Sequence, residues 1–410
     1  MTTEHKPFGA LHGIRIIDLT QMLAGPYATM MLADHGADVI KIEAPSGDMA
    51  RTGGPFRPDD AKKILGGYFQ SVNRNKKSVC LDLKTIEGAA ALKKLILEAD
   101  AVVENFRDGV MERLGLAYEE LERLNPRLVY GALRGFGDHR TGASPYLDWP
   151  AFDVVSQAMG GIMALTGPDA ATPTKIGPGV GDIIPGIMLA FGLLAAIHHA
   201  QRTGEGQFVD VSMVDSILAV CERMVWQHSI QGSVPGPEGN HHPFFCPFGM
   251  FPTTDGYVTI AAQEDMFFAK LCTVLGAPEL AEDSRFAKQS DRRKNRDAVI
   301  DQISKLTRSF SKSELSVRLG GKVPFGPVMN IAEIATDPHF AAREMLVPVS
   351  EPGVTSVQVA GVPIKMTKTP GGVFRRGPQI GEHTRNELKR VGLSDAEIDI
   401  IIKNRAASAD

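Results

Sequence analysis

The stretch GIRIIDLTQMLAGPYATMMLADHGADVIKIE, residues 13–43, predicts the fold of the chain. Residues 13–20 form a short run rich in β-forming side chains, and residues 37–43 form a second one. Between them, residues 24–36 follow a helical pattern that ends at a glycine. Strand, helix and strand within so short a stretch indicate a βαβ unit, from which parallel sheets are built.

The same alternation recurs along the first half of the chain. Further strands are predicted at residues 77–83, 100–106, 127–137 and 206–213, and helices at residues 85–99 and 214–230. Strands that alternate with helices favour an α/β fold with a mostly parallel, doubly wound sheet.

The middle of the chain differs in composition. Residues 232–256 are rich in Pro, Gly, His and Phe, and they precede a β-like run at residues 257–263 and a charged helical region that ends near Arg318. We therefore predict a linker followed by a smaller domain. Residues 355–367 are again strand-like, and the last predicted helix starts with a capping box formed by Ser394 and Glu397.

Composition and charge favour small molecules as partners. The chain has 410 residues, 43% of them hydrophobic, and a formal net charge of -4, which argues against nucleic acid as a partner. The first residues lack a basic segment followed by an apolar core, and no window predicts a membrane span, so we expect a cytoplasmic protein that binds no membrane. The four cysteines lie far apart without a C-x-x-C pair, which favours neither a disulfide framework nor a zinc site.

Residues 176–186, IGPGVGDIIPG, hold four glycines and two prolines around Asp182. A dinucleotide-binding loop would follow a strand, which the preceding residues do not predict, and Asp182 would repel a phosphate. No ATP-binding motif of the form G-x-x-x-x-G-K-[ST] occurs in the sequence. Two interpretations stay open. Asp182 either caps the following helix or attacks an acyl group across the open space that the glycines leave.

An ordinary aspartate is ionised at pH 7, so the second interpretation assigns the reaction rate to positioning of Asp182 and not to a shifted pKa.

Several strings of the sequence occur together in one known family. They are LAGPYATMMLADHGADVIKIE, GDMAR, NRNKKSVCLDLK, VVENF, FDVVSQAMGGIMALTG, the pair GD at Gly181 and Asp182, FGPV and GEHT. In this order, and over nearly the whole chain, they resemble the class III CoA-transferases. That superfamily includes formyl-CoA:oxalate transferases, carnitine CoA-transferases and α-methylacyl-CoA racemases.

The resemblance implies a Rossmann-like, doubly wound large domain built from both chain ends, with a smaller α+β domain between them. On this chain the large domain would take residues 1–218 and 346–410, the smaller domain residues 241–318, and the linkers residues 219–240 and 319–345. Two subunits of the family thread through one another as interlocked rings, so we expect a homodimer.

The resemblance also assigns the chemistry. Asp182 is the nucleophile, which attacks an acyl-CoA thioester to give a mixed anhydride. The CoA thiolate returns to form an aspartyl-CoA thioester, and a free carboxylic acid then repeats the sequence as acceptor. The CoA thioester is a substrate, so no permanently bound cofactor is expected.

Other residues match family positions that contact CoA, and a further set is predicted on chemical grounds to contact the substrate. For CoA these are Leu23, Ala24, Lys84, Asn105, Phe106, Arg113 and Arg134, among which the three cations would pair with phosphates. For the substrate, Gly181 brings its backbone N–H close, Arg51 meets a second carboxylate, and His241 and His242 line a lid. The two histidines and Cys246 lack a fourth ligand, so no metal is expected. Lys76 and Lys77 are predicted on a solvated loop, and Glu382 and His383 in GEHT are predicted to be structural.

Two departures from the family patterns bear on the reaction. Phe152 stands where the racemase branch has a proton-transferring His, which disfavours proton exchange by two bases. Residues 239–249, GNHHPFFCPFG, replace the polyglycine loop of the formyl-CoA transferases, and Gly53 replaces their Trp, so we expect a wider pocket for short dicarboxylates. The alternatives are an acyl-CoA racemase or isomerase of the same fold, and a CoA-binding protein without catalysis in which Asp182 is only a cap.

Overall fold

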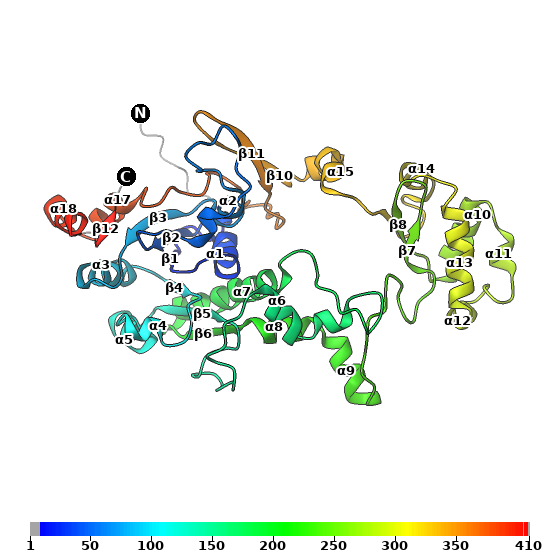
Figure 1. Cartoon of the computed structure of the whole chain (residues 1–410), viewed down its shortest axis with the longest axis horizontal. Coiled ribbons are helices and arrows are strands. Elements are labelled where there is room, and N and C mark those ends of the chain that lie inside the picture. Colours follow the sequence, from blue (N-terminus) through cyan, green and yellow to red (C-terminus); the bar gives the residue numbers. More distant parts are fainter. Residues whose placement is uncertain (1–8, 405, 409–410) are drawn as a thin grey trace. The chain divides into compact units, whose positions relative to one another are not determined.

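The computed structural model describes residues 9–404 and 406–408, and these fall into two compact units (Figure 1). The larger unit contains the described residues of 1–162, 176–226 and 338–410, and so draws on both ends of the chain. The smaller unit contains residues 163–175 and 227–337.

A seven-stranded sheet forms the centre of the larger unit, and Figure 1 shows its strands in the order β12-β3-β2-β1-β4-β5-β6. Strands β1 to β6 are parallel, as the alternation in the sequence predicts, and only β12 is antiparallel to its neighbour. Their bounds are Arg15–Asp18 (β1), Asp38–Glu43 (β2), Lys77–Leu81 (β3), Ala101–Glu104 (β4), Val129–Arg134 (β5), Phe208–Ser212 (β6) and Ala407–Ser408 (β12). The α/β fold is therefore confirmed.

The strand order reverses its direction between β1 and β4. In an open parallel sheet, ligands bind outside the carboxyl ends of the strands at such a point, because the two connections leave toward opposite sides there. The loops that follow β1 and β4 are therefore the place to search for a site.

Helices pack on both faces of the sheet. Side chains alternate along a strand, so Ile17 of β1 faces one apolar layer and Ile16 faces the other. The first layer includes α3 (Ile86–Leu97), α17 (Thr384–Arg390) and α18 (Asp395–Lys403). The second includes α1 (Ala24–Asp34) and α7 (Val180–Thr203). The remaining elements of this unit are α2 (Gly67–Asn73), α4 (Val110–Arg113), α5 (Tyr118–Leu124), α6 (Asp153–Met159), α8 (Met213–Val220), α16 (Pro338–Ala342), β10 (Leu346–Glu351) and β11 (Val354–Ala360). Helix α9 (Glu222–Gln231) begins in this unit and ends in the smaller one.

Two predicted elements are shorter in the structure. The helix expected at residues 214–230 is interrupted at Cys221, so that α8 and α9 are separate. The strand expected at residues 355–367 ends with β11 at Ala360, shortly before Pro363, which has no backbone N–H to donate to a neighbouring strand. The predicted capping box of Ser394 and Glu397 is confirmed at the start of α18.

By length and composition alone, α7 is apolar enough to cross a membrane, although 44% of its most apolar window is buried inside the protein. A core helix of a soluble protein passes the same test, and Leu189, Leu193 and Ile197 of α7 belong to the second apolar layer.

The smaller unit is a three-stranded antiparallel sheet with helices. The strands lie in the order β7-β8-β9, with bounds Phe248–Pro252, Tyr257–Ala261 and Phe325–Pro327. The helices are α10 (Asp265–Leu275), α11 (Glu279–Glu282), α12 (Gln289–Lys294), α13 (Arg296–Thr307), α14 (Lys312–Leu319) and α15 (Ile331–Thr336).

Lys76 and Lys77 do not lie on a solvated loop, and that prediction is wrong. The Lys76 side chain is fully buried, and its Nζ lies 2.9 Å from Asp18 Oδ2. The same Nζ donates hydrogen bonds to the Pro26 carbonyl and to Asn73 Oδ1. Lys77 opens β3 and forms ion pairs with two carboxylates at 2.7 Å each.

We predict that Lys76→Met lowers the free energy of unfolding by about 3–5 kcal/mol, because it leaves the Asp18 carboxylate buried without its ion-pair partner. Urea unfolding followed by circular dichroism measures this loss. Lys84→Met, on an exposed side chain, is the control and should change the value by less than about 0.5 kcal/mol. Equal stability of the two variants would contradict the importance of the buried pair.

Candidate active site

A cavity of about 310 Å³ lies at the carboxyl ends of β1, β4 and β5, where the strand order reverses. Its walls come from the loops after these strands, from residues 147 and 149–152, and from Met49, Tyr68 and Met213. Six of the residues predicted from the sequence line it together: Leu23, Ala24, Asn105, Phe106, Arg134 and Asp182.

Asp182 enters the cavity from the first turn of α7. The helix begins at Val180 and its N-cap residue is Gly179, so Asp182 is the third helical residue. The interpretation of Asp182 as a helix cap is therefore wrong. The carboxylate that accepts from the first turn belongs to Asp153, whose Oδ1 lies 2.8 Å from the Gly181 amide nitrogen.

The surroundings of Asp182 change its ionisation. Burial first, and then the negative charge of Asp153, raise the pKa of Asp182 to about 7. The expectation that Asp182 keeps an ordinary pKa is thus wrong, because the sequence does not show the second carboxylate or the cavity wall. A desolvated carboxylate of this kind is a stronger nucleophile than a hydrated one once it is ionised.

The glycines around Asp182 permit close packing. A β-carbon at Gly181 would lie 2.3 Å from the Asp153 carbonyl oxygen, and one at Gly186 would lie 2.6 Å from the Ala24 carbonyl oxygen. The N–H of Gly181 already donates to Asp153. The sequence had led us to expect that this N–H is directed at the reacting carbonyl of the substrate. In the structure it is directed at the Asp153 carboxylate instead.

Asp153 is itself held in place by Gln157 of the same helix. Gln157 is fully buried, and its amide nitrogen donates to both carboxylate oxygens of Asp153 at 2.9 and 3.0 Å. Its amide oxygen accepts from the backbone of Ile176 at 2.9 Å. The pair therefore ties α6 to the glycine-rich stretch that carries Asp182.

The loop after β1 is strained and clamped. Met22 has a φ of 67°, a left-handed conformation that is uncommon for residues other than glycine. The N–H of Met22 donates to Asp48 Oδ1 at 3.1 Å. Asn105 accepts from the Gln21 N–H at 2.8 Å and donates to the Gln21 carbonyl at 2.9 Å. The side-chain amide of Asn105 thus holds this loop in place. Asn105 also lines the cavity, and its contact with CoA stays a prediction.

Arg134 lies among carboxylates. Its guanidinium contacts Glu104 at 2.7 Å and Asp108 at 2.8 Å, and it also pairs with Asp138. Burial raises the pKa of Glu104 to about 7 in spite of the arginine. Because the negative charges match or outnumber the cation, pairing of Arg134 with a phosphate is not supported. Its buried Nε has no hydrogen-bond partner among the described residues and remains as a donor at the cavity wall.

Asp108, Asp138 and His139 bring possible metal-ligand atoms within 4.8 Å of one another. The two carboxylates already pair with Arg134, and Asp138 also pairs with Arg140. We therefore assign no metal to them.

The other predicted residues lie elsewhere. Lys84 and Arg113 are exposed side chains that do not line the cavity. Arg51 binds both oxygens of Glu43 at 2.7 Å and covers the ring of Phe69 at 3.8 Å, so its charge is already compensated. The structure therefore does not support the prediction that Arg51 binds a carboxylate of the substrate.

His241 and His242 belong to the smaller unit. His242 stacks on the ring of Phe245, with 4.6 Å between the ring centres, and His241 lies edge-on to Phe251. Their role as a lid stays a prediction.

Sequence reasoning missed Asp153, Gln157, Met49, Tyr68 and Trp149. For Asp153 a signal was available, since an acid stands at the start of a helix directly after Phe152 and Gln157 follows at the helical spacing of four. For the other three residues the sequence holds no local signal, because they are ordinary hydrophobic or aromatic side chains.

The chain resembles known proteins over most of its length. The profile of CoA-transferase family III matches residues 11–384. Succinyl-CoA:mesaconate CoA-transferase of Haloarcula hispanica is 46% identical over 389 residues, which are 94% of this chain and 97% of that protein. Succinyl-CoA–D-citramalate CoA-transferase of Chloroflexus aurantiacus is 37% identical over 98% of this chain and 99% of its own length. A crystal structure of a CAIB/BAIF family protein from Brucella suis matches with a TM-score of 0.84 and 35% identity, over 94% of this chain and 100% of that one.

We predict that Asp182→Asn raises the melting temperature, and does so more at pH 8 than at pH 5. The pKa of Asp182 is about 7 in the folded state and near 3.8 in the unfolded chain, so ionisation destabilises the wild type progressively between about pH 4 and pH 7. Asparagine carries no charge and removes that loss. Differential scanning calorimetry measures the difference.

Asp148→Asn is the matched control, because Asp148 is exposed between the lining residues Leu147 and Trp149. A gain in Asp182→Asn that does not depend on pH would contradict the raised pKa.

Proposed function

The chain belongs to the class III CoA-transferase family and is a CoA-transferase, and we propose that it moves CoA from a succinyl-type acyl-CoA to a free dicarboxylic acid through Asp182. The observation that carries this proposal is the Asp182 carboxylate itself, which lines the cavity at the carboxyl ends of the strands with a raised pKa. The printed names of the two relatives supply the substrate class, since each names succinyl-CoA and a dicarboxylic acid.

In the first half of the proposed reaction, the ionised Asp182 attacks the thioester carbonyl of the donor. The carbon–sulfur bond breaks, CoA leaves as a thiolate, and a mixed anhydride links the acyl group to Asp182. The thiolate then attacks the aspartyl carbonyl of this anhydride, which releases the donor acid and leaves an aspartyl-CoA thioester.

In the second half, the carboxylate of the acceptor attacks this thioester, and a second mixed anhydride forms as CoA leaves again. The thiolate attacks the acyl carbonyl of the acceptor, which gives the new acyl-CoA and restores the Asp182 carboxylate. One thioester replaces another, so the overall exchange needs no ATP and no permanently bound cofactor.

The cavity supports this chemistry through charge and position. Burial and the neighbouring Asp153 destabilise the Asp182 charge, which is relieved when Asp182 becomes an uncharged anhydride or thioester. We assign Leu23, Ala24 and Phe106 to contacts with the CoA arm, because they line the cavity beside Asp182. Lys84 and Arg113 stay proposed partners of the CoA phosphates by family resemblance. His241 and His242 stay proposed as a lid on chemical grounds alone.

Two other functions fit the structure less well. A racemase needs two proton-transferring groups, and Phe152, which is 61% exposed, lines the cavity where the racemase branch has its histidine. A CoA-binding protein without catalysis would use Asp182 as a helix cap, but Gly179 occupies that position.

We further propose that the protein is a cytoplasmic homodimer. On α7, Phe191 is 75% exposed and lies among the exposed side chains Ile187 and Leu194. An apolar surface of this kind is typical of a face that a second copy covers, and interlocked rings are the arrangement that the family resemblance implies.

Phe191→Asp should shift the protein from dimer to monomer or to insoluble aggregate, because it places a charge in the proposed interface. Analytical ultracentrifugation of the wild type and of Phe191→Asp measures the mass, with Ile400→Asp on the exposed face of α18 as control. A monomeric wild type at micromolar concentration would exclude the dimer.

The transfer reaction is tested by mass spectrometry of the CoA products. We expect wild-type protein, given succinyl-CoA and an excess of mesaconate or glutarate, to form the new acyl-CoA, and to do so far more slowly with propionate. Asp182→Ala should lose at least about 1000-fold in kcat/KM, because the covalent route then has no nucleophile.

Asp148→Ala, on the exposed rim position, is the control for the substitution itself. Unchanged exchange by Asp182→Ala would remove Asp182 as nucleophile. Equal kcat/KM for propionate and the dicarboxylates would remove the proposed acceptor class but leave the transfer reaction intact.

A further inference from the structure

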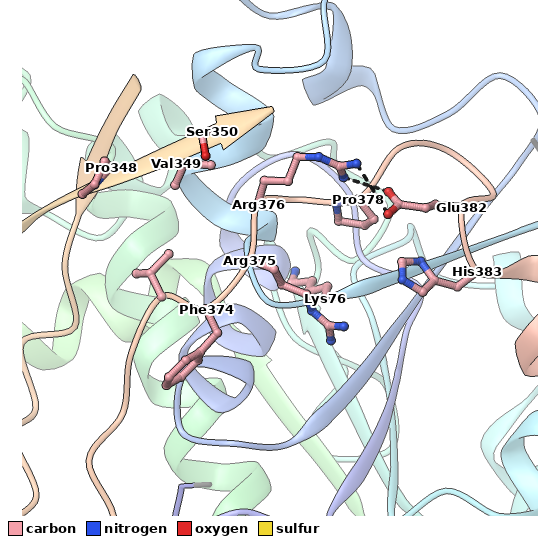
Figure 2. Close-up of a pocket in the computed structure, with 11 residues that line it drawn as sticks. Lys76, Pro348, Val349, Ser350, Phe374, Arg375, Arg376, Pro378, Glu382 and His383 are labelled. Atoms are coloured by element: carbon pink, nitrogen blue, oxygen red, sulfur yellow. Dashed lines mark hydrogen bonds and ion pairs between the residues drawn. The ribbon is translucent and has the colours of Figure 1, made fainter. Parts of the chain in front are cut away.

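A second cavity, of about 350 Å³, shares no lining residue with the cavity that contains Asp182. It is lined by Lys76, which precedes the first residue of β3, by β10 residues 348–350, and by the segment that ends in GEHT. Figure 2 shows Arg375, Arg376 and His383 around it. Asp182 and the other residues at the carboxyl ends of the strands do not contribute to this cavity.

The wall of this second cavity is fixed by hydrogen bonds to the turn before β3. Asn75 has a left-handed φ of 64°, and its side-chain oxygen accepts from the amides of Phe374 and Arg375 at 2.8 and 3.2 Å. The Asn75 N–H in turn donates to the Arg375 carbonyl at 3.2 Å. Segments about 300 residues apart in sequence are thus joined in a way that holds the side chains of the wall in place.

Arg375 presents a positive charge that no ion pair compensates among the described residues. Its guanidinium donates to the Asn75 carbonyl at 2.7 and 3.1 Å, which is a neutral acceptor. Desolvation of the guanidinium lowers the pKa of Arg375, and more distant carboxylates compensate only in part, although the residue as a whole is exposed.

The neighbouring Arg376 differs in this respect. It pairs with Glu351 and with Glu382, and Figure 2 shows its contact with Glu382. Burial alone would lower the pKa of Arg376, but these two carboxylates outweigh it and raise that pKa. Glu382 also accepts from the Gln379 amide at 2.7 Å. The formal charges of Arg375, Arg376, Glu351 and Glu382 sum to zero, and Arg375 is the arginine of this wall that has no ion pair among the described residues.

His383 adds a neutral donor. Its Nδ1 accepts from the Ser78 N–H at 3.3 Å, so the proton of the neutral ring lies on Nε2. Burial lowers the pKa of His383, which keeps the ring neutral at pH 7. The N–H of His383 donates to the Ser78 carbonyl at 2.9 Å, which fixes the backbone that carries the ring.

We propose that this cavity binds a phosphate group, free or carried by a small molecule, through the guanidinium of Arg375 and the Nε2–H of His383. A phosphate suits the wall because it offers several acceptor oxygens and a negative charge to the one arginine there that has no ion pair among the described residues, and to a ring N–H. Pro348, Val349 and the exposed ring of Phe374 provide an apolar side for the remainder of a carried phosphate. This assignment does not depend on the proposed function of Asp182.

Isothermal titration calorimetry of the full-length protein tests the proposal, with inorganic phosphate, glycerol phosphate and succinate as probes. We expect saturable binding of both phosphates and at least tenfold weaker binding of succinate. Arg375→Gln should weaken phosphate binding by at least about tenfold, because a charge-assisted hydrogen bond is lost. Arg375→Lys keeps the charge but not the planar donors. Its phosphate affinity should lie between those of the wild type and Arg375→Gln.

Arg385→Gln is the matched control, because Arg385 is an exposed arginine of the adjoining helix α17 that already pairs with Asp399. Asp182→Ala should bind phosphate like the wild type, which separates failure of this proposal from failure of the proposed reaction. Unfolding curves confirm that each variant folds, and His383→Gln provides a second variant should Arg375→Gln not fold.

Three results would overturn the proposal. One is the absence of saturable binding in the wild type, and another is equal phosphate affinity in wild type and Arg375→Gln. The third is that the wild type binds no phosphate while Arg375→Gln changes the oligomeric state. That result would mean that Arg375 pairs with a carboxylate of a second copy of the chain.

Discussion

Buried ion pairs at the end of β1 hold the loops around the candidate active site in place. Asp18, the last residue of β1, is fully buried and pairs with Lys76 at 2.9 Å, while its carboxylate also accepts from the amide of Thr20 and from the hydroxyl of Thr29. Lys41 of β2 pairs with Asp48 at 2.8 Å and donates to the Thr20 carbonyl. Charges placed in a protein interior persist only where such partners compensate their loss of hydration.

These contacts extend to the cavity. Asp48 accepts a hydrogen bond from the N–H of Met22. Asn105, in the loop after β4, forms hydrogen bonds with both the N–H and the carbonyl of Gln21. The strained conformation of Met22 is held by these partners, and it sets the course of the chain into Leu23 and α1. The wall against which we expect the CoA arm to lie is thus defined by buried electrostatics beneath it.

A parallel arrangement holds the nucleophile. Asp153 takes over the capping of α7 by accepting from Gly181, and Gln157 orients Asp153. Because the cap is supplied by another helix, the Asp182 side chain is left for the cavity, where burial and Asp153 raise its pKa to about 7. In the resting protein the carboxylates of Asp182 and Asp153 repel one another. Acylation of Asp182 removes one of the two charges, so the repulsion is relieved in the covalent intermediate of the proposed reaction.

The sequence by itself determined what depends on near neighbours in the chain. The βαβ alternation follows from local periodicity and turn residues, and the capping box of Ser394 follows from a spacing of three. Membership of the family, and with it the place of Asp182, follows from strings that are each continuous in the chain. Only the tertiary structure decided the partners of charged side chains. Lys76 meets Asp18 from 58 positions away, and Gly181 meets Asp153 from 28. Such pairings set burial and pKa, and they depend on how the sheet and its helices pack, which local patterns in a sequence do not encode.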